Sequence, residues 1–416
     1  MTYLARLQKL LTTTAIALTA LSGSAWRADA GPYTQTNLVS DLPGLAALTE
    51  PELVNPWGLS HTGASPIWSS NQSTNTANLF TISPSLTVTK AKPAGTDGNI
   101  VIPPGGAGAV GPTGQVASTS MTSFLVGNGG DNNPAHFIFA NLNGSISAWD
   151  MGQTAFSQVT TPGALYTGLA INTAQNRLYA ANGNSGGRID VFDSAFHSVN
   201  LGATAFTDPN LPANFVPFNV QDIGGKVYVT YAPAGRGNQL AATPGLGIVD
   251  VFDENGGSLQ RLITGSALAP LAAPWGLALA PAGFGVFGGD LLVGNFSTVA
   301  SEINAFDPNT GAFAGTITVD PGAGNTPGGL WGLIFGNGGS GGPANTLFFS
   351  DGLDSETHGL FAALTPATAV PEPSGLAILG TALALLGIRR LRSRQRAAEP
   401  LQRRAPARSA AVYCDD

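Results

Sequence analysis

The feature that most constrains this chain is a short motif that recurs six times. Each copy has a glycine, or in one case an asparagine, two positions after a proline, tyrosine or leucine. The copies occupy residues 55–59, 112–116, 166–170, 217–220, 274–278 and 330–333. Aligned on Gly58, Gly114, Gly168, Asn219, Gly276 and Gly332, they are 56, 54, 51, 57 and 56 residues apart. Self-similarity at a fixed period is the signature of repeat architectures, so the sequence predicts six similar modules.

The residues after each copy indicate β-structure. In the third module, residues 177–182 and 188–193 are rich in apolar and aromatic side chains and flank a glycine turn, the pattern of two antiparallel strands. The other modules repeat this plan at residues 66–70 with 78–82, 136–140 with 145–150, 226–231 with 247–253, 290–295 with 303–307, and 347–350 with 359–361. The 55 glycines and 29 prolines suit a chain made of turns, and residues 31–369 show no long amphipathic helix.

Four-stranded sheets repeated around an axis leave only short, protected edges. We therefore predict an all-β fold, a six-bladed β-propeller over residues 31–369. A pair of β-sandwiches or a β-helix is the alternative, although a β-helix has a much shorter period.

The run Tyr33–Ser40 has the composition of a strand but precedes the first module, whereas the sixth module has only residues 362–369 left after Phe361. We expect the N-terminal strand to complete the last blade, with residues 34–39 paired to residues 355–365.

The N-terminus has the pattern of a secretory signal peptide. Arg6 and Lys9 precede an apolar region, residues 10–21, and the small-x-small site Ala28-Asp29-Ala30 follows. Cleavage by signal peptidase would remove residues 1–30. An N-terminal anchor helix is the alternative.

The C-terminus joins three unlike elements. Pro371, Glu372 and Pro373 precede an uncharged apolar run, residues 375–388. A basic cluster follows, formed by Arg389, Arg390, Arg392, Arg394 and Arg396. As a helix the run would be roughly 21 Å long, short for a hydrocarbon core of about 30 Å, but arginine side chains can snorkel to the interface. We expect a transmembrane helix whose arginine side faces the cytoplasm, with a buried core helix as the alternative.

Residues 370–396 resemble the PEP-CTERM sorting signal of Gram-negative bacteria, which is presented to a membrane enzyme called exosortase. The resemblance implies anchoring in the inner membrane, then sorting to the cell surface or the extracellular matrix. Residues 397–416, which we expect to be a disordered, basic cytoplasmic tail, make this end longer than such signals usually are.

The predicted propeller resembles those of the NHL and gluconolactonase types. Residues 36–362 are also similar to a family of exported bacterial propellers that often carry this sorting signal. The segments that carry the latter resemblance are 37–41, 53–58, 206–212, 273–281 and 358–361. The resemblance implies a six-bladed propeller and no particular activity.

Charge excludes one class of partner. Between Gly31 and Ile388 there are seven Lys and Arg against 21 Asp and Glu, a net charge of −14, so nucleic acid is not an expected partner. The only cysteine is Cys414, so the chain can form no internal disulfide.

Polar residues close the second predicted strand of several modules, at Asn71, Asn182, Asn295 and Asp351. In a propeller such strand ends lie on one face, where amide and carboxylate oxygens could bind Ca²⁺. Asn and Asp are also ordinary turn formers at strand ends. A gluconolactonase-like site would in addition need a glutamate, and neither Glu302 nor Glu356 has a convincing position in the repeat.

Trp57, Trp275 and Trp331 occupy one repeat position, and Asn55 and Asn219 lie within the repeat segments. The tryptophans could form an aromatic platform for a sugar ring. Alternatively, they fill the wedges between adjacent blades.

Signs of catalysis are few. The four histidines, His61, His136, His197 and His358, are not spaced as a metal pair, and no Gly-x-Ser-x-Gly motif occurs. The sequence favours an exported, non-enzymatic binding or scaffold protein whose partner is an extracellular polysaccharide or an envelope protein. A calcium-dependent hydrolase or lactonase of the gluconolactonase type is the alternative.

Overall fold

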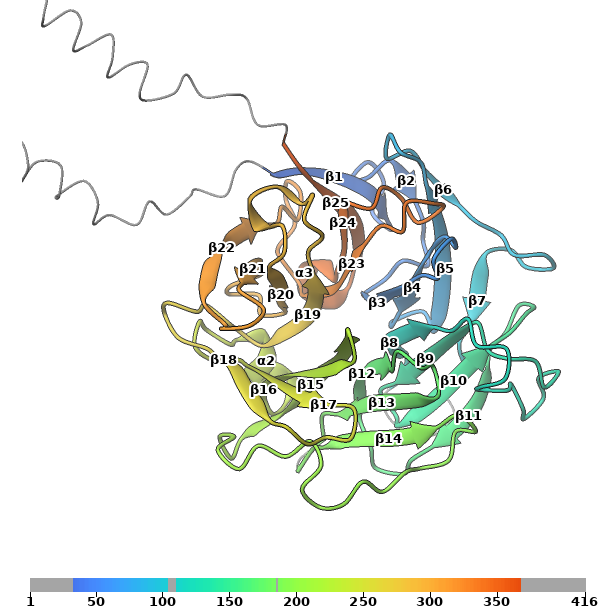
Figure 1. Cartoon of the computed structure of the whole chain (residues 1–416). Coiled ribbons are helices and arrows are strands. Elements are labelled where there is room, and N and C mark those ends of the chain that lie inside the picture. The colour runs from blue at the N-terminus through green and yellow to red at the C-terminus, as the bar shows by residue number, and fades with distance from the viewer. Residues whose placement is uncertain (1–32, 104–109, 185, 368–416) are drawn as a thin grey trace, which may run out of the picture. The chain divides into compact units, whose positions relative to one another are not determined.

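Six sheets surround a common axis in the computed structural model, which describes residues 33–103, 110–184 and 186–367 (Figure 1). Their strands pair antiparallel except for one short parallel pair at the edge of the last sheet. The predicted six-bladed β-propeller is confirmed. The signal peptide, residues 1–30, the sorting signal, residues 370–396, and the tail, residues 397–416, lie outside the described residues. Among the residues that are described, no helix has the length and apolar character that a membrane span needs.

Blades 1 to 3 follow in chain order. Blade 1 contains β3 (Pro56–Ser60), β4 (Ile67–Asn71), β5 (Thr76–Ile82), β6 (Val88–Lys90) and β7 (Asn99–Val101). Blade 2 contains β8 (Pro112–Ala117), β9 (Phe137–Asn141), β10 (Ser145–Trp149) and β11 (Phe156–Thr160). Blade 3 has three strands instead of the expected four, β12 (Tyr166–Ile171), β13 (Arg177–Asn182) and β14 (Ile189–Asp193).

Blades 4 to 6 complete the ring. Blade 4 contains β15 (Phe215–Ile223), β16 (Lys226–Pro233), β17 (Ile248–Asp253) and β18 (Gln260–Thr264). Blade 5 contains β19 (Pro274–Leu279), β20 (Leu291–Asn295), β21 (Glu302–Phe306) and β22 (Phe313–Thr318). Blade 6 contains β23 (Leu330–Phe335), β24 (Leu347–Asp351), β25 (Leu360–Pro366), β1 (Tyr33–Ser40) and β2 (Leu48–Thr49). Loops carry the short helices α2 (Arg236–Leu240) and α3 (Leu353–Glu356) and the 3₁₀ turn η1 (Gly285–Phe287).

Strand β1 closes the ring as predicted. It pairs antiparallel with β25 from Tyr33 opposite Pro366 to Ser40 opposite Leu360. The side chains of Leu38 and Val39 are fully buried. Because β1 is the outer neighbour of β25, the last blade is built from both ends of the described chain.

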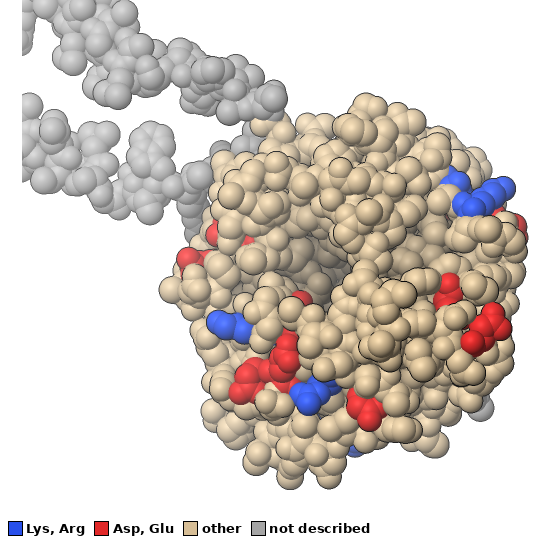
Figure 2. Space-filling view, turned by 45° about the vertical axis from the view of Figure 1, so that its right-hand side comes forward, with Lys and Arg blue, Asp and Glu red and all other residues tan. Residues whose placement is uncertain are grey.

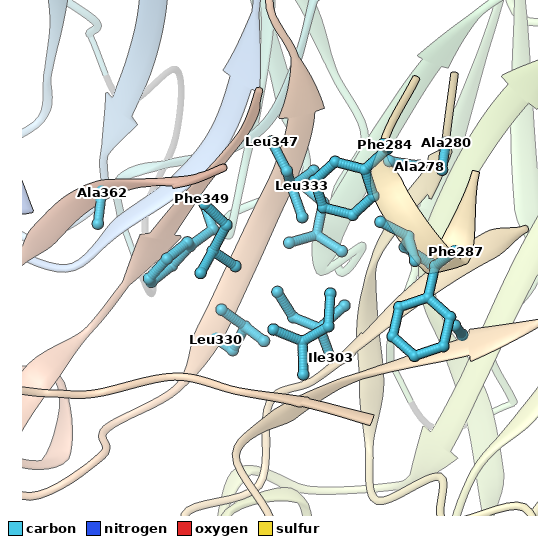
Figure 3. Close-up of a cluster of buried hydrophobic side chains, with 14 of the residues drawn as sticks. Ala278, Ala280, Phe284, Phe287, Ile303, Leu330, Leu333, Leu347, Phe349 and Ala362 are labelled. Carbon is cyan, nitrogen blue, oxygen red and sulfur yellow. The ribbon is translucent and has the colours of Figure 1, made fainter. Parts of the chain in front are cut away.

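The apolar core lies mainly in the wedges between neighbouring blades. Figure 3 shows the wedge between blades 5 and 6, where Ala278, Phe284 and Ile303 of blade 5 face Leu330 and Phe349 of blade 6. Both faces of each sheet pack in this way, since successive side chains of a strand point into opposite wedges. This explains why the strands read as apolar runs with little alternation.

The innermost strands meet their neighbours backbone to backbone at the repeated glycines. A Cβ atom added to Gly58 would lie 2.6 Å from the carbonyl oxygen of Thr113 in blade 2, and one added to Gly332 would lie 2.7 Å from that of Trp57 in blade 1. In blade 4, Asn219 takes the glycine position, and its amide donates a hydrogen bond of 2.8 Å to the carbonyl oxygen of Trp275 in blade 5. The motif that revealed the repeat is thus the contact that joins the blades.

Every blade also has a β-bulge at this position, where the register between the first two strands shifts. Bulges re-aim side chains. The residues immediately before the glycine position differ among the blades, and they are Trp57, Thr113, Thr167, Phe218, Trp275 and Trp331. Four are aromatic and two are small, so the axis is filled unevenly.

We predict that Gly58→Ala destabilises the propeller, because the new Cβ would collide with backbone atoms of Thr113 and Gln115 that cannot rotate away. Overpacking of this kind typically costs about 1–3 kcal/mol. The measurement is the free energy of unfolding in urea. Gly63→Ala is the control, since no atom lies within 4 Å of the added Cβ there. Equal stabilities of the two variants would contradict the proposed packing role.

Candidate binding site

Aromatic side chains from four blades meet near the start of the innermost strands. The rings of Trp57 and Trp331 stack with centroids 3.5 Å apart, and Trp275 packs edge-on to both at 6.1 and 5.5 Å. Phe218 and Phe296 complete the cluster. The three tryptophans predicted as ligand-binding residues therefore lie together, almost fully buried.

The indole N–H groups show that the cluster bridges the axis. Trp275 of blade 5 donates a hydrogen bond of 2.9 Å to the carbonyl oxygen of Thr167 in blade 3, a blade that is not its neighbour. Trp331 donates to Asn55 Oδ1 at 3.0 Å. The Nε1 atom of Trp57 has no hydrogen-bond partner among the described residues. The three tryptophan rings thus pack together at the axis. The alternative expectation was that each would fill a wedge between two adjacent blades.

A single cation covers these rings. The guanidinium carbon of Arg236, at the start of α2, lies 4.1 Å from the ring centroid of Phe296, 4.7 Å from that of Trp331 and 5.1 Å from that of Trp57. Such contacts are favourable cation–π interactions. Desolvation lowers the pKa of Arg236 to about 9, so the side chain stays charged at neutral pH.

Glu356 of α3 is the counter-charge. Its carboxylate accepts hydrogen bonds from Nε of Arg236 at 2.9 Å and from Nη2 of the same guanidinium, and a third from Asn55 Nδ2 at 3.1 Å. The Arg236 side chain is 34% exposed and that of Glu356 14%. The partly desolvated pair has the bidentate geometry that makes Arg–carboxylate contacts strong and directional.

The backbone that presents Glu356 is unusual. Asp354, Ser355 and Glu356 have φ values of 51°, 59° and 70° in succession, and Asn55 has 48°. Non-glycine residues in this left-handed region cost on the order of 1–3 kcal/mol each and persist only where surrounding contacts hold them. Here Thr326 holds the turn, because its backbone N–H and its hydroxyl both donate to the Asp354 carboxylate.

These side chains border a cavity of about 640 Å³. Its lining includes Trp57, Phe218, Arg236 and Glu356, together with Thr167 and Leu142 from blades 3 and 2. Gln239, a mostly buried residue with a side-chain amide, also lines it. A concave, mainly apolar space with a few polar groups and this volume is typical of small-ligand sites.

A second cavity, of about 210 Å³, lies at the other end of the innermost strands and is lined by Gly58, Gly114, His61, Gln115 and Asp222. Burial raises the pKa of Asp222 above its ordinary value. Trp275 borders this cavity and Trp57 the larger one, so the aromatic cluster lies between them. Figure 2 shows one face of the propeller, hollowed near its centre and sparsely charged.

The residues predicted to bind calcium occupy equivalent positions at the ends of second strands, but each bonds within its own blade. Asn71 donates to Asn78 and Thr76, and Asn182 donates to Asp190. The side-chain oxygens of Asn182, Asn295 and Asp351 accept backbone N–H groups from Leu165, Ala272 and Gly329 respectively. These bonds fix the loop that enters each innermost strand.

The set does not fit a calcium cage. Only Asp351 is a carboxylate, and the oxygens already serve the loops of separate blades. Within residues 33–103, 110–184 and 186–367, no three His, Cys, Asp or Glu residues are grouped closely enough to hold a metal ion. Of the second predicted set, Asn55 and the three tryptophans come together, while Asn219 bonds to the Trp275 backbone.

Sequence reasoning missed Arg236 and Gln239 and found no place for Glu356. All three lie in loops outside the repeat, in α2 and α3, where no periodic signal exists. The side chains before the repeated glycines did contain a usable signal. Four are aromatic, but Thr113 and Thr167 are small, and Thr167 lines the cavity.

No protein-family model matches the chain. It is 27% identical over 343 residues to an uncharacterised protein of Acanthamoeba polyphaga mimivirus, covering 79% of this chain and 78% of that protein. A second uncharacterised protein of the same virus is 32% identical over 217 residues, or 50% of this chain and 53% of the viral one.

Solved structures with a similar fold include a gluconolactonase of Xanthomonas campestris, with 19% identity, a TM-score of 0.41 and coverage of 62% and 77% of the two chains. A Bacteroides thetaiotaomicron protein of unknown function has 11% identity, a TM-score of 0.47 and coverage of 80% and 76%. Similarities at this level do not extend to activity.

We predict that Asp351→Asn reduces the pH dependence of stability. Burial raises the pKa of Asp351 to about 7, and its Oδ2 atom has no hydrogen-bond partner among the described residues. A carboxyl whose pKa is higher in the folded chain than in the unfolded one binds its proton mainly in the folded state. Stability is therefore lost as the pH rises from about 4 to about 7, by at most roughly 1.4 kcal/mol per pH unit for one group.

The measurement is urea unfolding at several pH values between 4 and 8. The substituted side-chain amide keeps an oxygen acceptor for the Gly329 N–H and carries no titrating proton, so the slope should be shallower than in the wild type. Asp250, whose pKa burial also raises to about 7, maintains part of the slope. Exposed Asp131→Asn is the control. An unchanged slope in Asp351→Asn would refute the assignment.

Proposed function

We propose that this protein is an exported binding protein that holds its ligand in the cavity bordered by Trp57, Phe218, Arg236 and Glu356, and that it performs no chemistry there. The observation that carries the proposal is this cavity, which combines aromatic walls, side-chain amides and a single ion pair. Pockets of this composition bind through apolar contact and obtain specificity from a few polar groups.

The chemistry of the lining supports binding over catalysis. Glu356 is the one carboxylate among the described lining residues, and Arg236 engages it. The hydroxyls of Ser73 and Thr167 donate to Gln72 and to the Ala181 carbonyl, and neither contacts a base. Acid–base or nucleophilic catalysis needs a second positioned group, which this lining does not supply.

The expected partner is a component of the cell envelope or the extracellular matrix. Support comes from the sequence of the ends, where residues 1–30 have the signal-peptide pattern and residues 370–396 resemble a sorting signal. A propeller exported and sorted in this way would meet envelope proteins and extracellular polysaccharides.

We predict that Ser73→Phe blocks binding, because Ser73 is an exposed residue that lines the cavity and a phenyl ring there would occupy it. The measurement is thermal shift and calorimetry of the full-length protein against neutral oligosaccharides, uronates, amines and guanidinium compounds. Ser85→Phe, at an exposed turn in blade 1, is the matched control. The proposal fails if no compound binds, or if both variants bind as the wild type does.

A separate prediction concerns the ends. In a host that has an exosortase, replacing Pro371, Glu372 and Pro373 with alanine should leave an unprocessed precursor in the inner membrane. Replacing Arg389, Arg390 and Arg392 with glutamine should weaken the orientation signal. Fractionation followed by immunoblotting reports both the location and the size of the protein. Arrival of both mutants at the surface, at wild-type size and amount, would refute the sorting assignment.

A further inference from the structure

The aromatic cluster and Glu356 together form a site for a planar cation. The Arg236 guanidinium lies over the rings of Trp57, Phe296 and Trp331, and the Glu356 carboxylate accepts two of its N–H groups in bidentate fashion. We call these three rings and Glu356 the cage. A flat, delocalised cation stacks on aromatic faces and matches a carboxylate fork, whereas an ammonium ion does neither as well. The occupant at present is Arg236 of the same chain.

The segment that carries Arg236 is suited to release it. Arg236 begins a helix of five residues, lies between Gly235 and Gly237, and has no side-chain cap at the helix start. Its side chain is one-third exposed. Withdrawal of the guanidinium therefore needs only side-chain and local backbone rotation. The propeller core does not have to move.

Glu356 and its surroundings, in contrast, are fixed. The left-handed turn of Asp354, Ser355 and Glu356 is held by Thr326, and Asn55 links Glu356 to Trp331. Such backbone conformations cluster at ligand clamps. The fixed half of the ion pair is thus the acidic half, and the replaceable half is the cation.

Two further features suit a cationic ligand. The chain between Gly31 and Ile388 has seven basic and 21 acidic residues, so its field attracts cations and repels anions. Trp57, whose buried indole N–H has no hydrogen-bond partner among the described residues, and Gln239 line the same cavity. The side-chain amide of Gln239 offers a donor for a peptide carbonyl oxygen beside a bound guanidinium.

We propose that this cage binds an arginine side chain of a partner polypeptide, and that Arg236 is an internal stand-in which the partner displaces. The proposal rests on the binding function assigned above and names its ligand class. Because Arg236 competes from within the same molecule, the wild type should bind a free arginine probe weakly, in proportion to the small fraction of molecules with an open cage.

The test uses the full-length Arg236→Ala variant and three probes: N-acetylarginine amide, the lysine analogue, and the uncharged citrulline analogue. Binding is followed by tryptophan fluorescence and calorimetry. Arg236→Ala should bind the arginine probe at least tenfold more tightly than the wild type and at least tenfold more tightly than it binds citrulline. Adding Glu356→Gln should abolish this preference. Arg188→Ala, which removes an exposed arginine paired with Asp190, should behave as the wild type.

The proposal is overturned if folded Arg236→Ala binds no arginine probe, or binds arginine and citrulline equally. If Arg236→Ala does not fold, Arg236→Lys provides the same test, because an ammonium ion lacks the guanidinium fork and should yield to the probe more readily than Arg236. Failure of that variant to bind more tightly than the wild type also overturns it. Binding of an amine-bearing oligosaccharide or a neutral sugar that Ser73→Phe abolishes, without arginine binding, would refute this inference and leave the proposed function intact.

Discussion

The innermost strands of neighbouring blades meet backbone to backbone at the axis, and a repeated glycine is what permits this approach. Gly58 faces Thr113, Gly276 faces the carbonyl of Trp331, and Gly332 faces the carbonyl of Trp57, so the last blade contacts the first through the same position. In blade 4, Asn219 takes the place of the glycine, and its side-chain amide donates a hydrogen bond to the carbonyl oxygen of Trp275 in blade 5. This contact determines how closely neighbouring innermost strands approach each other at the axis.

The composition of the site depends on the side chain that immediately precedes the repeated glycine position in each blade. The bulge at this position allows the preceding side chain to reach the axis, and large rings from blades 1, 4, 5 and 6 meet there while blades 2 and 3 contribute threonines. The cavity is lined by Trp57 and Phe218 together with the smaller Thr167, and loops of blades 4 and 6 bring Arg236 and Glu356 to its border.

The repeat predicted the fold, its closure by residues 33–40 and the equivalence of the three tryptophans, because each is encoded as a periodic pattern. It did not predict the Arg236–Glu356 pair, whose members are 120 residues apart in loops of different length. The polar residues at the ends of the second strands were predicted to bind calcium from their shared position in the repeat. Their position in the repeat is real, but buried loops need hydrogen-bond acceptors for their backbone N–H groups, and Asn182, Asn295 and Asp351 meet that need.

The central claim is that ligand binds against the aromatic cluster at the axis. Indole N–H resonances test it directly, since a ¹⁵N-tryptophan-labelled protein reports each ring separately during titration with a ligand from the screen. The account predicts saturable shifts for Trp57, which lines the cavity, and for Trp331, which stacks on Trp57 and lies under Arg236. It predicts unchanged signals for Trp68 and Trp149, which pack between blades 1 and 2. Shifts confined to Trp68 and Trp149, or binding without any change at Trp57, would contradict it.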